Sequence, residues 1–314
     1  MLSRHAEDLF WLGRYMERAE NTARMLDVTY HSALEAGSDR SAAEVWGDLY
    51  EVLLLDEDEV AHLDGGGSLI FDPTIEFSVR SVATRARENA RGTRELLSAE
   101  VWEGINSLHL DLARSARDSI NDERPYDVLR RIKAGSQTVT GAVQSTLARN
   151  DPYRFIGLGQ MIERASNTVR ILIVWNRRLQ ASPAGTAYAE WVKLLKSVSA
   201  YEAYLRRYRA SITAGQVLDF LLQETDLPRS VGHCLRTAEA FILEMAVGEI
   251  GRDCRRLAGR LRSSVEFSQP STLPIEQLSE FLQHLEEEIL ELANCIQREF
   301  FRPGSASMHV YEAF

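Results

Sequence analysis

Lysine is scarce in this sequence. The 314 residues include 33 arginines but only three lysines, at positions 133, 193 and 196. A GC-rich coding sequence is one explanation. The other is recognition of carboxylate or phosphate groups, which the planar guanidinium binds in a bidentate way and lysine does not. Acidic residues outnumber basic ones by 46 to 36, a formal net charge of −10. That charge argues against a general nucleic-acid-binding protein, although not against a local arginine patch.

Cysteine and long apolar runs are also nearly absent. The three cysteines, Cys234, Cys254 and Cys295, show no C-x-x-C pairing, and we interpret them as reduced thiols that act as small buried hydrophobic residues. No apolar run approaches the ~20 residues that a membrane-spanning helix needs, and the first residues lack the apolar core of a secretion signal. We therefore expect a cytoplasmic protein without a membrane partner.

Proline and glycine, at 8 and 19 residues, interrupt the chain only sparsely. No stretch shows the sustained period-two alternation of a β-strand, so the sequence predicts an all-α helical bundle. We expect long helices over 3–36, 42–55, 76–97, 99–121, 126–149, 153–180, 187–209, 229–262 and 275–301, and a shorter one over 214–223. The segment 56–75 is predicted to be a loop, and 302–314 a mobile or partner-docked tail.

Three helix starts carry hydroxyl side chains suited to capping. Ser41 with Glu44, and Thr213 with Gln216, have the spacing of a capping box. At the start of the helix predicted over 229–262, Arg229 and Ser230 leave two alternatives open. Ser230 caps this helix, or, with arginine beside it, it binds an anionic group at the helix N-terminus.

A segment near the beginning of the chain recurs in the middle. Residues 12–28 read LGRYMERAENTARMLDV and residues 158–174 read LGQMIERASNTVRILIV, with ten of seventeen positions identical at an offset of 146. Such self-similarity indicates an internal repeat. We predict two pseudo-repeated helical halves, residues 1–150 and 151–301, that together form one compact unit.

The polar residues shared by the two copies predict a candidate binding site. They are Glu17, Asn21 and Arg24 in the first half and Glu163, Asn167 and Arg170 in the second. Their i, i+4, i+7 spacing places each set on one helix face. Gly13 and Gly159 lie one turn before each glutamate, and because a glycine inside a helix costs roughly 1 kcal/mol, they predict close approach of a backbone or a ligand. Arg18 and Arg164 are expected to anchor a neighbouring element.

Two interpretations of these repeated sets stay open. In the first, glutamate, asparagine and arginine form buried polar pairs that fix how the two halves dock. In the second, they line a pseudo-symmetric cleft that holds a zwitterion or a metal ion, or recruits a peptide. The second interpretation makes both sets substrate-binding residues.

A further arginine stripe lies on the helix predicted over 76–97. Arg80, Arg87, Arg91 and Arg94 fall within roughly 60° of one another around this helix. Glu88 and Glu95 lie close enough to neutralise part of the stripe. The stripe is therefore either a solvated, salt-bridged face or the wall of an anion-binding site to which Arg80, Arg87 and Arg91 contribute.

The segments 1–28, 86–91 and 228–231 together resemble the bacterial alpha-E domain family, whose most specific motif here is the E-R-A-x-N-T helix. The resemblance covers nearly the whole chain. It implies an all-helical fold and marks Glu17, Arg18, Asn21 and Arg24, with their counterparts at an offset of 146, as the motif residues. It assigns no firm activity.

The resemblance also implies partners. Genes of this family typically stand beside an ATP-grasp-type ligase and a transglutaminase-like protein, which implies a role in forming or modifying amide-linked peptides. We therefore expect an accessory component that recognises a peptide or an amino-acid-like substrate. The alternative is an enzyme in its own right, metal-dependent or peptide-processing, that uses Glu17 and Glu163.

Known catalytic motifs are otherwise missing. The sequence has no G-x-x-x-x-G-K-[ST] loop for ATP phosphates, no D-D-x-x-D, and a single Glu-x-x-His spacing, Glu59 with His62, where a di-iron site needs two. The seven histidines are scattered along the chain. We therefore predict no cofactor and no metal site, and we assign no catalytic residue.

Overall fold

The computed structural model describes residues 1–301 apart from 35–40, 64–65, 119–124, 182–186 and 210. Within these ranges the chain forms helices and no β-strand, with only an isolated antiparallel bridge between Val247 and Ile250. The predicted all-α class is confirmed. The tail predicted over 302–314 lies outside the described residues.

The helices fall into two compact units, Met1–Gln160 and Met161–Phe314, divided inside the long helix α8 (Asp151–Ala181). The first unit contains α1 (Ser3–Leu34), α2 (Ala42–Val52), α3 (Glu57–Ala61), α4 (Gly66–Phe71), α5 (Val79–Gly92), η1 (Arg94–Leu96), α6 (Ala99–Asp118) and α7 (Pro125–Thr146). The second contains α9 (Ala187–Ser197), α10 (Tyr201–Tyr208), α11 (Ala214–Gln223), α12 (Val231–Met245), α13 (Arg252–Glu266), η3 (Pro270–Thr272), α14 (Ile275–Ile296) and the π-helical turn η4 (Gln297–Phe301). The halves predicted over 1–150 and 151–301 stay a prediction.

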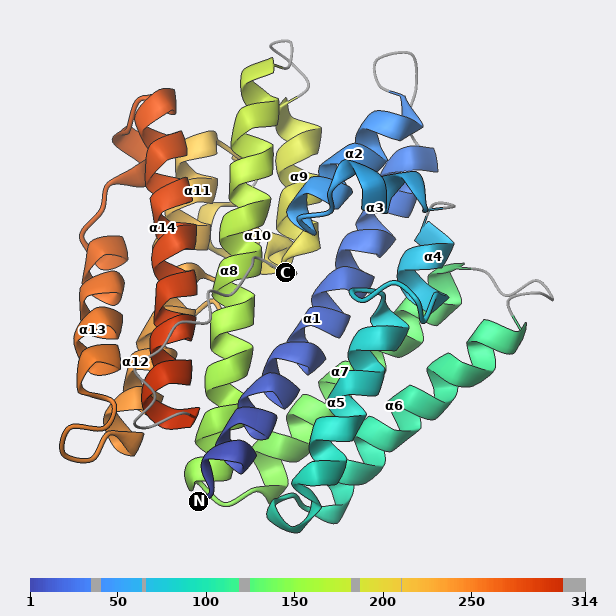
Figure 1. Ribbon diagram of the computed structural model, residues 1–314. Coiled ribbons are helices and arrows are strands. Elements are labelled where there is room, and N and C mark those ends of the chain that lie inside the picture. The colour runs from blue at the N-terminus through green and yellow to red at the C-terminus, as the bar shows by residue number, and fades with distance from the viewer. Residues whose placement is uncertain (35–40, 64–65, 119–124, 182–186, 210, 302–314) are drawn as a thin grey trace. The chain divides into compact units, whose positions relative to one another are not determined.

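The long helix α1 is the centre of the first unit. It packs against α5 and α7, and also against α2 and α4, while α6 packs on α5 and α7 (Figure 1). Its apolar residues recur every three or four positions and therefore form one stripe. The members of the stripe are all buried: Leu12, Met16, Ala19, Ala23 and Leu26.

The beginnings of α1 and α8 cross with almost no space between their backbones. A Cβ atom added to Gly13 would lie 2.0 Å from the carbonyl oxygen of Ile156, and one added to Gly159 would lie 2.0 Å from that of Phe10. The two contacts are reciprocal, and their residues are related by the same offset of 146. The predicted close approach of a backbone to both glycines is confirmed.

The second unit forms its core from α11, α12, α13 and α14. Helix α12 packs against α11 and α13, and α13 packs against α14. The last helix contributes a buried stripe of the expected period: Leu278, Leu282, Leu285, Ile289 and Leu292. Because α14 packs in this core, its side chains contact residues of α8 and α13.

Three predicted helices are wrong in their continuity. The helix predicted over 76–97 ends as α5 at Gly92, and the separate 3-10 turn η1 follows it. The helix predicted over 187–209 is divided between α9 and α10, where Ser199 has a φ of 52°. The helix predicted over 229–262 is divided between α12 and α13, where Gly248 and Gly251 have φ values of 62° and 80°. A right-handed helix cannot continue through left-handed residues, so α9 is separated from α10, and α12 from α13. Gly251 is the N-cap of α13.

The loop predicted over 56–75 is also partly wrong, because it contains the short helices α3 and α4. Asp56 and Glu59 form a full capping box at the start of α3. The capping box predicted at Ser41 and Glu44 is confirmed. Thr213 caps α11 as well, accepting a hydrogen bond from the Gln216 amide at 3.3 Å.

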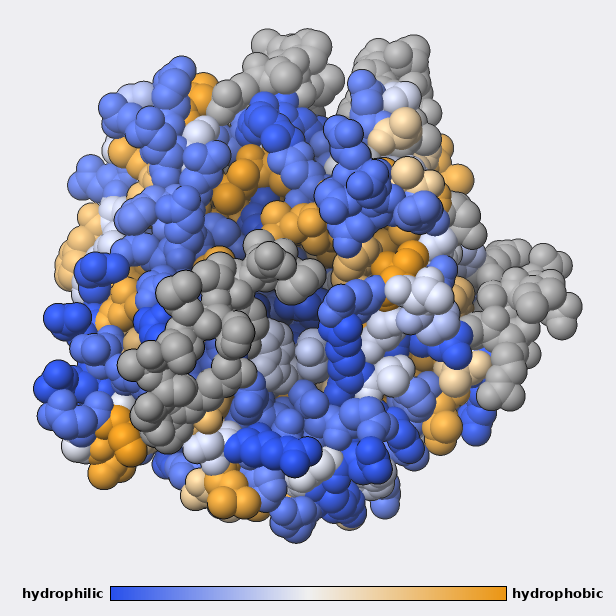
Figure 2. All heavy atoms as spheres, in the orientation of Figure 1, coloured by the Kyte–Doolittle hydropathy of each residue, from blue (hydrophilic) through white to orange (hydrophobic). Residues whose placement is uncertain are grey.

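The face drawn in Figure 2 is mostly hydrophilic, with apolar residues in small separate patches. None of the helices in the described ranges combines the length and the apolar character that crossing a membrane requires.

Candidate functional site

The first set of predicted site residues lies deep in the first unit. Glu17 and Asn21 on α1 are 1% and 3% exposed, and the guanidinium of Arg24 is paired with Glu20 one turn earlier. The same Glu20 carboxylate accepts a hydrogen bond from Gln137 Nε2 of α7 at 3.3 Å. Glu20 is a member of this network that the repeat did not single out, although its i, i+4 spacing from Arg24 predicts such a pair.

The second set is equally buried in the second unit. Glu163 and Asn167 on α8 are 2% and 5% exposed. A carboxylate from α14 faces Arg170, since Glu286 Oε1 lies 3.6 Å from Arg170 Nε. Ser166 Oγ donates a hydrogen bond to that same oxygen at 2.6 Å.

The two networks differ in which helix supplies the carboxylate that faces the arginine. At the offset of 146, Glu20 corresponds to Ser166. In the first unit the carboxylate that faces the arginine is carried by the same helix. In the second unit a serine at the matching position holds a carboxylate supplied by α14. Each arginine side chain is only 13% exposed, so a facing carboxylate is needed to offset the cost of burying the guanidinium.

The Arg170 guanidinium has one unused donor. Its Nε is buried and donates no hydrogen bond to any described residue, because 3.6 Å from Glu286 is too long for a hydrogen bond. Buried polar groups normally find partners, and an exception in a folded protein calls for an explanation. A ligand acceptor, such as a carboxylate, is one such explanation.

Arg164 anchors a neighbouring segment, as predicted for the residue after the motif glutamate. Its Nη1 donates a hydrogen bond to the carbonyl of Pro228 at 3.3 Å, and Thr168 Oγ1 donates one to the carbonyl of Arg229 at 3.0 Å. Helix α8 therefore holds the chain where α12 begins. The hydrogen bond to its backbone carbonyl places Arg229 next to α8. Arg229 is buried.

Ser230 is the N-cap of α12 and is completely buried. Its hydroxyl accepts a hydrogen bond from the His233 amide at 3.1 Å and donates a short one to the carbonyl of Glu224. Both functions of the hydroxyl are thus used within the protein. This geometry corresponds to the capping alternative for Ser230.

The arginine stripe, with Arg80, Arg87 and Arg91 on α5 and Arg94 on η1, is largely paired. Arg91 Nη2 lies 2.7 Å from Glu88, and Arg87 Nε donates to Asn106 Oδ1 of α6 at 2.8 Å. Arg80 Nη1 donates to the carbonyl of Phe71 at 3.4 Å. The guanidinium groups of Arg87 and Arg94 each lie 5.8 Å from the ring centre of Trp102, and cation–π contacts of this kind stabilise the helix pair. The contacts match a salt-bridged face, and anion binding here stays a prediction.

Two arginines of this stripe act on a histidine of α6. Burial, followed by the charges of Arg87 and Arg80, lowers the pKa of His109, and Glu88 acts weakly in the opposite direction. Thr84 Oγ1 lies 3.4 Å from the ring Nδ1. The fold therefore holds His109 neutral at a pH where an exposed histidine begins to take up a proton.

The lowered pKa of His109 predicts that the first unit becomes less stable as the pH falls. An unfolded chain protonates His109 near its ordinary pKa of 6.5, whereas the folded chain does so only at lower pH. The unfolded state therefore binds more protons as the pH falls below about 6.5, and stability is lost there. We expect the melting temperature of His109→Gln to fall less than that of the wild type between pH 7.5 and 5.5. Parallel curves would contradict this account.

A hollow between α6 and α7 was not predicted. It has a volume of about 370 Å³ and is lined by Glu100, Glu103 and Asp111 together with apolar residues of both helices. Arg131 at its wall donates a hydrogen bond to Ser115 Oγ at 2.6 Å. No repeated motif marks these residues, so sequence reasoning had no signal for this hollow.

Comparison with known proteins places the chain among relatives of undefined role. It is 23% identical over 293 residues to a protein of Mycobacterium bovis and to two proteins of Mycobacterium tuberculosis, all described as uncharacterized. The matches cover 85% of this chain but 32% of each relative, so the chain spans about a third of their length. No solved structure matches it.

The Alpha-E family, described as a predicted alpha-helical domain with a conserved ER motif, matches residues 1–301. The chain, with E-R pairs at 17–18 and 163–164, therefore belongs to the Alpha-E family.

Proposed function

We propose that the chain is an accessory component of an amide-bond-forming or peptide-modifying system that contains an ATP-grasp-type ligase and a transglutaminase-like protein. In this role it recognises a peptide or an amino-acid-like substrate through its buried arginine, glutamate and asparagine residues. Arg170 binds a carboxylate of the substrate. Glu163 and Asn167 provide acceptors for an ammonium or amide group nearby, and Glu17, Asn21 and Arg24 form the corresponding set on α1.

The observation that carries the proposal is the unused Nε donor of Arg170. A guanidinium presents a planar fork that matches a carboxylate in a bidentate way. Glu286 faces this fork at 3.6 Å without a hydrogen bond from Nε, so it balances the charge while the donor stays available. In this proposal a substrate carboxylate supplies the missing acceptor.

The assignment of partners rests on the gene neighbours that the family resemblance implies and on the kind of group that the proposed site selects. A system that joins or modifies amide-linked peptides handles free carboxylates and amines. The chain has no phosphate-binding loop of the G-x-x-x-x-G-K-[ST] type, so an ATP-dependent ligase supplies the activated intermediate in this proposal.

The test is reconstitution with the ATP-grasp-type ligase and the transglutaminase-like protein of the same organism. A charge-assisted hydrogen bond contributes about 1.5–3 kcal/mol, so Arg170→Gln is expected to lower the initial rate of product formation roughly tenfold or more. The double variant Glu17→Ala with Glu163→Ala is expected to lower it as well. The matched control is Arg256→Gln, because Arg256 is 84% exposed on α13.

Circular dichroism and thermal melting show whether each variant is folded before its rate is interpreted. Arg170→Lys keeps the charge but not the planar fork, and we expect it to remain slow. Wild-type rates in folded Arg170→Gln would contradict the proposal. Product formed without the ligase would instead favour the alternative, an enzyme that uses Glu17 and Glu163.

A further inference from the structure

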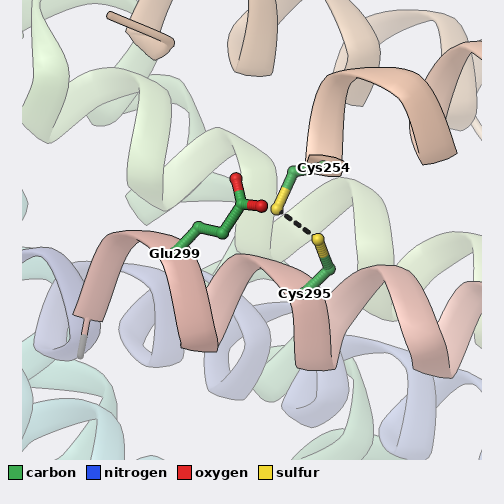
Figure 3. Close-up of side chains that lie close together, drawn as sticks. All are labelled: Cys254, Cys295 and Glu299. Atoms are coloured by element: carbon green, nitrogen blue, oxygen red, sulfur yellow. Dashed lines mark hydrogen bonds between the residues drawn. The ribbon is translucent and has the colours of Figure 1, made fainter. Parts of the chain in front are cut away.

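Three side chains with metal-binding atoms converge in the second unit. Cys254 comes from the first turn of α13, Cys295 from the end of α14, and Glu299 from η4 (Figure 3). Their ligand atoms all lie within 4.8 Å of one another, and the two sulfur atoms are 2.7 Å apart. Both cysteines are buried, and the carboxylate of Glu299 is turned toward Cys254.

The fold brings these residues together through a tight contact at the start of α13. Gly251 has a φ of 80°, and a Cβ atom added to it would lie 2.7 Å from Cζ of Phe300, the residue after Glu299. The positive φ favours glycine here, and the backbone that opens α13 lies against the Phe300 ring of η4. Cys254 follows three residues later. Cys295 and Glu299 are four positions apart, where α14 passes into η4.

Glu299 itself has an unused acceptor. Its Oε2 is buried, and none of the described residues donates a hydrogen bond to it. A buried carboxylate oxygen without a donor is costly, and two thiols offer it little, because an S–H group is a weak donor. A bound cation removes this cost, since the carboxylate then becomes a ligand.

We propose that Cys254, Cys295 and Glu299 bind one Zn²⁺ ion, with a water molecule or an external ligand atom in the fourth position. Two thiolates and one carboxylate are a donor set that zinc accepts in tetrahedral geometry. Binding releases the two thiol protons to solvent, and no electrons are transferred. With Zn–S bonds of about 2.3 Å, the sulfur atoms move to about 3.8 Å apart, roughly 1 Å further than in the metal-free arrangement.

A disulfide between the two cysteines is the competing outcome, because the sulfur atoms are close enough to bond after a small movement. The position of the carboxylate favours zinc. A disulfide leaves Glu299 Oε2 without a partner, whereas a metal ion uses all three side chains. The C-x-x-C spacing typical of many zinc sites is absent, so this site depends on residues 41 positions apart in the chain.

The experiment uses the full chain, purified under reducing conditions, stripped with a chelator and titrated with Zn²⁺ or Co²⁺. We expect one zinc per chain by elemental analysis, a rise in melting temperature, and, with Co²⁺, a thiolate-to-metal charge-transfer band with the visible bands of a tetrahedral site. Cys254→Ser and Cys295→Ser should each abolish the charge-transfer band or strongly weaken it. Glu299→Gln should weaken metal affinity at least tenfold while leaving thiolate absorption at saturating Co²⁺.

The matched control is Cys234→Ser, because Cys234 is a buried cysteine of the same unit whose Sγ contacts the carbonyl of Pro228. It should bind zinc like the wild type. Less than a tenth of an equivalent of zinc after titration would overturn the proposal, as would cobalt spectra that Cys254→Ser leaves unchanged. A non-reducing mass lower by two hydrogens, with no zinc uptake after reduction, would assign the pair to a disulfide instead.

Discussion

Replacing Gly13 by alanine is expected to lower the free energy of unfolding by about 3 kcal/mol or more. The new Cβ atom would lie 2.0 Å from the carbonyl oxygen of Ile156 and 2.9 Å from its carbonyl carbon. Both atoms belong to the backbone of α8, so no side-chain rotation relieves the clash and the two helices must separate. Alanine is otherwise the better helix residue by about 1 kcal/mol, so this gain only partly offsets the loss. Gly159→Ala, which meets the carbonyl of Phe10, should behave in the same way.

The measurement is chemical denaturation of the full chain, with Gly47→Ala and Gly141→Ala as controls. Both control glycines lie inside helices, and a Cβ atom added to either meets nothing within 4 Å. These two variants should be unchanged or up to about 1 kcal/mol more stable. If Gly13→Ala is also as stable as the wild type, the close crossing of α1 and α8 does not exist as described.

The second large effect is expected at Glu190 in the second unit. Its carboxylate contacts Arg178 and Lys193, and the Glu190 and Arg178 side chains are only 8% and 11% exposed. The backbone carbonyl of Glu190 also accepts a hydrogen bond from Trp175 Nε1 at 3.1 Å. Glu190→Ala removes the carboxylate and leaves two cations near each other in a poorly solvated place. Breaking a buried pair in this way costs about 3–5 kcal/mol.

Glu249→Ala is the matched control, because Glu249 also pairs with an arginine, Arg252, but both side chains are more than 60% exposed. An exposed pair contributes about 0–1 kcal/mol, so this variant should unfold almost like the wild type. Thermal and denaturant unfolding of both variants distinguish the two cases. Equal small losses for Glu190→Ala and Glu249→Ala would mean that the Arg178 pair is not buried in solution.

Local patterns in the sequence predicted much of the fold. The periodicity of apolar residues between Leu12 and Leu26 predicted α1. The capping residues Ser41 and Thr213 predicted the starts of α2 and α11. The cost of a glycine inside a helix was enough to predict the close approach at Gly13. The breaks at Ser199 and Gly248 were missed, because a single left-handed residue within an apolar helical pattern leaves the periodicity on both sides intact.

The candidate site was harder to predict, because its pairing is long-range. Arg24 finds its carboxylate four residues away, a spacing visible in the sequence. Arg170 faces Glu286, which lies 116 positions later on another helix, and nothing local connects them. The cysteines were interpreted as isolated hydrophobic residues for the same reason. Cys254 and Cys295 become neighbours only through the packing of α13 on α14.

The most direct test of the proposed accessory role is whether the purified chain binds the ATP-grasp-type ligase of its own organism. Size-exclusion chromatography with light scattering, followed by mass spectrometry of the complex, measures both the stoichiometry and any trapped peptide. We predict a stable complex with a bound, carboxylate-bearing peptide or amino acid that Arg170→Gln fails to retain. The absence of a complex, with and without Mg²⁺-ATP, would contradict the proposed function.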